Sequence, residues 1–131
     1  MTIYLAIKYH ADLRNRELVE PILKRLESAH HKTLFALRDA ENWGELSLSP
    51  RELMRKSFAL LDAADLVLVE LSEKGVGLGI EAGYAYARAK PIITLAKKGS
   101  DVSTTLRGIS AEVLFYDSLT DLEKILVGLE L

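Results

Sequence analysis

One short run of branched apolar residues, between Asp65 and Leu71, constrains the fold of this chain more than any other feature. The run reads Asp-Leu-Val-Leu-Val-Glu-Leu, without the polar alternation of a strand that has one wet face. Nearly continuous apolar strands are typical of the centre of a parallel sheet, which is covered on both faces. We therefore predict a central parallel strand over residues 65–71.

Strand and helix patterns alternate on both sides of this run. Ser49-Pro50-Arg51-Glu52 combines a capping Ser, a Pro suited to the first helical position and a capping-box Glu, so a helix is predicted to begin there. The predicted strands span residues 2–8, 33–36, 65–71, 91–96 and 113–116, and the predicted helices span 13–29, 50–63, 80–89 and the residues from 120 onward. This alternation predicts an α/β fold, a five-stranded parallel sheet sandwiched by helices, as one domain over residues 1–131.

Composition argues against several classes of function. The 131 residues carry 17 basic and 19 acidic side chains, so no basic field is available to bind duplex nucleic acid or an anionic membrane. The absence of Cys removes disulfides, thiolate metal sites and thiol nucleophiles. No apolar stretch reaches the roughly 18 residues of a membrane span. We expect a cytoplasmic protein with no metal site and no cofactor.

The segments that follow the predicted strands are the candidates for a site. Parallel sheets of this kind bind ligands beyond the carboxyl ends of their strands, near a switch in strand order. Those segments are residues 8–12, 37–43, 72–81 and 97–105.

The segment after the central strand contains the densest chemistry. Gly75, Gly77 and Gly79 are predicted to form a loop that leads into a helix, where a ligand can approach the backbone closely. Glu81 is predicted to lie in the first turn of that helix, where the helix dipole favours an ionised carboxylate. Such a carboxylate can act as a nucleophile, but Glu is also common in first turns simply because it stabilises the helix.

A family resemblance favours the catalytic interpretation. The stretch Gly75-Val-Gly-Leu-Gly-Ile-Glu81-Ala-Gly-Tyr-Ala85, followed by Lys90-Pro91-Ile92, resembles the nucleoside 2-deoxyribosyltransferase family, which includes the 2′-deoxynucleoside 5′-phosphate N-hydrolases. The opening strand, with Tyr4, is similar to the family's first strand, whose Tyr hydroxyl lies beside the catalytic Glu. The resemblance implies a Rossmann-like fold in which Glu81 attacks the anomeric carbon of a nucleoside and Tyr4 orients it.

The segment from Ser103 to Gly108 is similar to the one in which the N-hydrolases bind a 5′-phosphate across a dimer interface. The resemblance therefore implies that Ser103 binds phosphate and that the protein is a homodimer or a higher homo-oligomer. Arg107 is a further candidate for a phosphate contact, or else an exposed basic residue.

Two positions depart from the family pattern. Ser57 stands where the family carries a catalytic Asp, and Gly75 stands where the transferases carry Asp and the N-hydrolases carry Ser. Asp39 and Glu41 are candidate substitutes for the missing acid, or else charges of a solvated loop.

Two aromatic side chains are candidates to stack on a base, namely Trp43 and Tyr9. We expect an enzyme that cleaves or transfers the N-glycosidic bond of a nucleoside or nucleoside 5′-monophosphate. The alternative is a non-catalytic nucleotide-binding sensor or regulatory module on the same fold.

Overall fold

Parallel strands form the centre of the molecule, and the prediction of a five-stranded parallel α/β sheet is confirmed. The computed structural model describes residues 1–129. The strands pair in the order β2-β1-β3-β4-β5, every neighbouring pair is parallel, and β3 lies in the middle as its apolar run predicts. Their bounds are β1 Thr2–Ile7, β2 Lys32–Leu34, β3 Leu66–Glu70, β4 Ile92–Lys97 and β5 Glu112–Tyr116.

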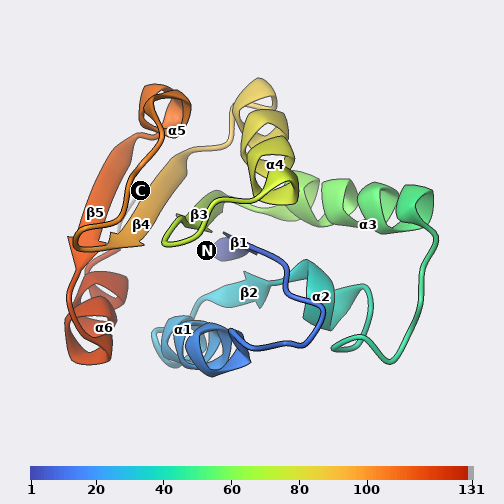
Figure 1. Cartoon of the computed structure of the whole chain (residues 1–131), viewed down its shortest axis with the longest axis horizontal. Helices are drawn as coiled ribbons and strands as arrows, with labels where there is room; N and C mark the ends of the chain where they lie inside the picture. The colour runs from blue at the N-terminus through green and yellow to red at the C-terminus, as the bar shows by residue number, and fades with distance from the viewer. Residues whose placement is uncertain (130–131) are drawn as a thin grey trace.

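Helices cover both faces of this sheet (Figure 1). In Figure 1, α1 and α6 lie on one side, and α3, α4 and α5 lie on the other. The bounds of the helices are α1 Arg16–Ser28, α2 Ala36–Asp39, α3 Pro50–Ala63, α4 Val76–Ala87, α5 Thr104–Ile109 and α6 Leu119–Val127. Ser49 caps α3 as expected, since its side chain accepts from the Glu52 N–H at the start of the helix.

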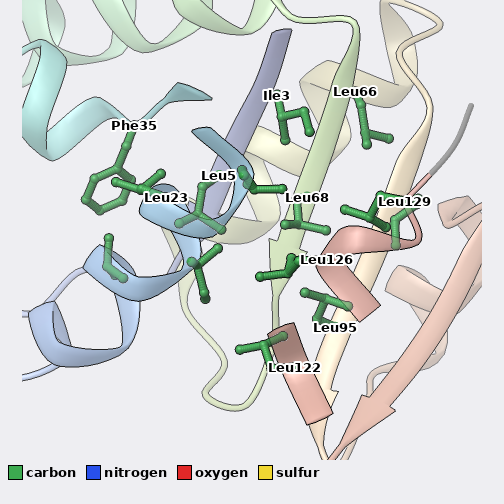
Figure 2. Close-up of a cluster of buried hydrophobic side chains, with 14 of the residues drawn as sticks. Ile3, Leu5, Leu23, Phe35, Leu66, Leu68, Leu95, Leu122, Leu126 and Leu129 are labelled. Carbon is green, nitrogen blue, oxygen red and sulfur yellow. The ribbon is translucent and has the colours of Figure 1, made fainter. Parts of the chain in front are cut away.

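Each face of the sheet has its own buried cluster. On the α1 and α6 face, Leu23, Leu122 and Leu126 pack against the sheet residues Leu5 and Leu68, as Figure 2 shows. The opposite face holds the second cluster, in which Tyr4, Val67 and Val69 pack with residues of α3 and α4. The two faces of β3 are therefore both dry, which explains its continuous apolar sequence.

The glycine segment differs from its prediction. Residues 75–79 were expected to be a loop before a helix at 80, but α4 begins at Val76, so Gly77 and Gly79 are helical and only Gly75 precedes the helix. The reason is the spacing of Leu78, Ala82 and Ala85, which are all buried on one face of α4. Burial of Leu78 against the sheet offsets the roughly 1 kcal/mol that each helical Gly costs relative to Ala.

The residues that follow β2 also differ from their prediction. A polar loop was expected there, but residues 36–39 form the short helix α2. The Asp39 carboxylate accepts from the backbone N–H of Phe35 at 2.7 Å and so caps this helical turn.

We predict that Leu68→Ala destabilises the protein by about 2–5 kcal/mol, because Leu68 is fully buried in the central strand and its truncation leaves a cavity. The free energy of unfolding in urea measures this change. Leu46→Ala is the matched control, since Leu46 is 54% exposed and its loss should change stability by less than about 0.5 kcal/mol. Equal effects of the two substitutions would contradict this description of the core.

Candidate active site

A cleft of about 290 Å³ lies at the carboxyl end of β1. The strand order switches direction at this place, because β2 lies on one side of β1 and β3 lies on the other. Ligands of open parallel sheets bind at such switch points. The cleft is lined by Tyr4, Leu5, Ile7, Lys8, Tyr9, His10, Asn15, Phe35, Ala36, Leu37, Glu41, Leu53, Met54, Ser57, Gly77 and Glu81.

Glu81 reaches this cleft from α4. It lies in the second turn of the helix and not in the first, because α4 begins at Val76, so the helix dipole does not govern its charge as expected from the sequence. Burial raises the pKa of the Glu81 carboxyl from its ordinary value of 4.5 to about 7, and the nearby Tyr4 hydroxyl opposes part of this rise. The carboxyl is thus poised to gain or lose a proton near neutral pH.

Tyr4 contributes a buried hydroxyl beside Glu81. Its side chain is fully buried in β1, and both burial and the Glu81 charge raise the pKa of its hydroxyl, so Tyr4 keeps its proton. The hydroxyl oxygen forms no regular hydrogen bond with any of residues 1–129. Ser57 of α3, also buried, lies close enough to influence the same hydroxyl. A polar donor is therefore held beside the carboxylate with room to bond a ligand.

The loop after β1 is tied across the mouth of the cleft. The Lys8 ammonium donates to the carbonyl oxygen of Lys74 at 3.2 Å, and His10 Nε2 lies 3.1 Å from a carboxylate oxygen of Glu73. The Asn15 amide donates back to the Lys8 carbonyl at 2.9 Å. These contacts hold the loop after β1 against the loop after β3.

Several residues predicted for the site line the cleft together. Glu41, Tyr9 and Gly77 join Tyr4 and Glu81 there. An adjoining hollow of about 190 Å³ is lined by Gly75, again with Gly77 and Glu81. The roles predicted for these residues stay predictions.

The structure does not bring Asp39 and Trp43 into the cleft. The Asp39 carboxylate caps α2 and also accepts from Arg38 at 2.9 Å, so its oxygens are engaged away from the cleft. Trp43 packs on Phe35 with ring centroids 5.6 Å apart, and the Arg16 guanidinium covers the ring at 4.2 Å. Of the two candidate acids, only Glu41 lines the cleft.

Ser103, Arg107 and Gly79 also lie outside this cleft. Ser103 caps α5 by accepting from the Leu106 N–H at 3.3 Å, and the Arg107 guanidinium lies 6.0 Å from the Phe115 ring. The segment that holds them follows β4, which β3 separates from β1. Ser103 therefore lies two strands away from the carboxyl end of β1.

A second buried carboxylate, Glu70, belongs to the opposite face of the sheet. It accepts from the Tyr116 hydroxyl at 2.9 Å and from the Ser72 hydroxyl, and burial raises its pKa. The Ser72 oxygen in turn accepts from the Lys97 N–H at 3.0 Å. This network joins the carboxyl ends of β3, β4 and β5 and has no access to the cleft.

The sequence interpretation passed over Asn15 and the apolar wall formed by Leu53 and Met54, and it favoured an exposed His10 over one that contacts a ligand. His10 reads in the sequence as an isolated loop residue. The signal that could have found it is topological: it follows β1 while Glu73 follows β3, and parallel neighbouring strands end at the same edge.

Neither a membrane-spanning helix nor a metal-binding cluster occurs within residues 1–129. No helix in this part of the chain is long and apolar enough to cross a membrane. No three or more His, Asp or Glu side chains of these residues gather in a way that could hold a metal ion.

Comparison with known proteins places this chain in an enzyme family. The nucleoside 2-deoxyribosyltransferase family matches residues 3–118. The chain therefore belongs to this family, which confirms the resemblance seen in the sequence and the expectation of an enzyme.

Individual relatives agree with this assignment. The "Putative 2'-deoxynucleoside 5'-phosphate N-hydrolase 1" of Thermofilum pendens is 29% identical over 133 residues, which cover 99% of this chain and 93% of that protein. The CMP N-glycosidase BcmB of Clostridium botulinum shares the fold with a TM-score of 0.74 at 18% identity, over 96% of this chain and 97% of that one. A 2-deoxyribosyltransferase of Bacillus psychrosaccharolyticus does so with a TM-score of 0.69 at 17% identity, over 94% and 90% of the two chains.

We predict that Glu81→Gln stabilises the folded protein at pH 8 but not at pH 5. The folded carboxyl titrates near 7 and the unfolded one near 4.5, so the folded state loses stability as the pH rises through this interval. Removing the charge should recover on the order of 1–3 kcal/mol at pH 8.

Urea unfolding at the two pH values measures this difference. Glu112→Gln, at an exposed position of β5, is the control and should leave stability nearly unchanged at both. If Glu81→Gln and the wild type were equally stable at pH 8, burial would not raise the pKa of this carboxyl.

Proposed function

We propose that this protein cleaves or transfers the N-glycosidic bond of a nucleoside or nucleoside 5′-monophosphate, with Glu81 as the nucleophile. Family membership supports nucleoside or nucleotide N-glycosidic chemistry, and the relatives described above carry the names of an N-hydrolase, an N-glycosidase and a deoxyribosyltransferase. The assignment of Glu81 rests on the cleft.

The observation that carries the proposal is the pairing of the Glu81 carboxyl with the Tyr4 hydroxyl in a cleft of about 290 Å³. This volume is at the small end of the range for ligand pockets. Apolar side chains such as Leu53 and Met54 form one wall, and Tyr9, which is 63% exposed, forms part of the rim. A sugar ring beside Glu81 and a base against the apolar wall fit this distribution of polar and apolar groups.

The chemistry follows from this placement. The ionised Glu81 carboxylate attacks the anomeric carbon as the bond to the base breaks, through a transition state with oxocarbenium character. The glycosyl-enzyme is then opened by water, which gives hydrolysis, or by a second base, which gives transfer. The Tyr4 hydroxyl, which keeps its proton, stabilises the charged carboxylate before attack and orients it.

Gly75 and Gly77 contribute no side chain to the hollow beside Glu81, so the sugar can approach the backbone at these two positions. Ser103 and Arg107 belong to this site only through a second copy of the chain, so phosphate binding by them and a homodimer are proposed together. The alternative of a non-catalytic sensor module has no support from the family or from the named relatives.

We predict that the protein releases free base from at least one member of a panel of nucleosides and their 5′-monophosphates. Glu81→Gln should lower kcat by about a thousandfold or more, because the amide cannot form the covalent bond to the sugar. Chromatography of the released base measures both rates, and matched pairs with and without the phosphate distinguish nucleoside from nucleotide substrates. Undiminished release by Glu81→Gln would remove Glu81 from the mechanism, and nucleotide binding without any release would contradict the proposed function.

We predict that kcat/KM falls as the pH drops below about 7, where the Glu81 carboxyl takes up a proton and loses its nucleophilicity. Tyr4→Phe should move this fall to higher pH, because the Tyr4 hydroxyl lowers the pKa of Glu81. The pH dependence of kcat/KM for the two proteins tests this. A fall that stays in place or moves to lower pH in Tyr4→Phe would show that the hydroxyl does not act on Glu81.

A further inference from the structure

We propose that His10, held by Glu73, is the catalytic acid–base residue that protonates the departing base. The inference rests on the function proposed above and adds a second catalytic residue to it. When an N-glycosidic bond breaks, its electron pair stays on a base nitrogen, and a proton donor at the base stabilises that negative charge. The cleft therefore needs a proton donor in addition to Glu81.

The position of His10 meets this need. Its side chain is only 9% exposed, yet it lines the same cleft as Glu81. A carboxylate oxygen of Glu73 lies 3.1 Å from Nε2, at ion-pair distance, although the two atoms do not form a regular hydrogen bond. In this proposal Nδ1, the other ring nitrogen, exchanges the proton with the base. A carboxylate beside an imidazole is a recurring device of acid–base catalysis.

The loop that holds His10 is fixed on both sides. The Leu13 N–H donates to the His10 carbonyl at 3.0 Å, and the Asn15 amide donates to the Lys8 carbonyl at 2.9 Å. Together with the contact to Glu73 these bonds place the ring before a ligand arrives, which reduces the cost of orienting a catalytic group.

Two other donors near Glu81 are already placed. The Lys8 ammonium is bonded to the carbonyl oxygen of Lys74, and the Tyr4 hydroxyl lies beside Glu81. The Tyr9 and Ser57 hydroxyls also line the cleft, and the rival carboxyl there is that of Glu41. Its side chain lacks an orienting partner of the kind that Glu73 provides for His10 among the ion pairs of residues 1–129.

In the proposed step one bond to the anomeric carbon breaks and another forms. The bond from the anomeric carbon to the base breaks, its electron pair goes to the base, and the Nδ1 proton of His10 follows it. A bond forms between the anomeric carbon and Glu81. In hydrolysis, water then attacks the anomeric carbon, the bond to Glu81 breaks, and the proton of the water returns to His10.

The test compares two leaving groups. A natural nucleoside substrate needs a proton on its base, whereas the 4-nitrophenyl glycoside of the same sugar releases a stable anion that needs none. His10→Gln should lower kcat on the nucleoside by about a hundredfold or more and change kcat on the nitrophenyl glycoside by only a few-fold. Glu73→Gln should show the same selectivity with a smaller loss, and it serves as the second variant if His10→Gln fails to fold. His31→Gln, outside the cleft, should leave both rates unchanged.

The outcomes separate this inference from the function on which it rests. A wild-type protein that releases neither base nor nitrophenol overturns both. Wild-type release that depends on Glu81, together with no loss or an equal loss on the two substrates in His10→Gln, overturns the role of His10 alone. A loss selective for the nucleoside in Glu41→Gln and absent in His10→Gln assigns the proton to Glu41 and likewise overturns it.

Discussion

The parallel pairing of β1 with β3 is the constraint on which the site depends. Its register, from Ile3 opposite Leu66 to Ile7 opposite Glu70, makes both strands end at the same edge of the sheet. The loops that follow them therefore face each other, and α4, which follows β3, begins beside the end of β1. The tie of His10 to Glu73 and the approach of Tyr4 to Glu81 are two consequences of this one register.

A carboxylate in this position is controlled by burial. Because α4 begins at Val76, Glu81 lies beyond the first turn, where the helix dipole has little effect. The low polarity around it raises the pKa of its carboxyl to about 7, and the Tyr4 hydroxyl limits the rise. Burial of this carboxyl lowers the stability of the fold at high pH. It also leaves the ionised carboxylate poorly solvated, and therefore reactive toward an electron-poor carbon.

The sequence predicted the fold well because the strongest patterns are local. The apolar run of β3 and the capping box at Ser49 each depend on neighbouring residues, and both are where they were expected. The predicted start of α4 was wrong. Glycines favour a loop locally, whereas burial of Leu78 against the sheet favours a helix. Tertiary contact decided between them.

The site was predictable only where a motif marked it. Glu81 and Tyr4 stood out through the family resemblance, and both line the cleft. His10 did not, since its partner Glu73 lies 63 positions further along the chain and only the pairing of the strands brings them together. Trp43 was expected to face the ligand, but the Arg16 guanidinium and the Phe35 ring hold it elsewhere, which no local pattern reveals.

The central claim is that Glu81 becomes covalently bound to the sugar, and the mass of the protein during turnover tests this most directly. Acid quenching of the enzyme with its substrate, followed by intact-protein and peptide mass spectrometry, should reveal a fraction of the protein heavier by one sugar residue, with the addition on the peptide that contains Glu81. Base release with the added mass on another peptide, or with no added mass at all at the shortest accessible times, would contradict the account.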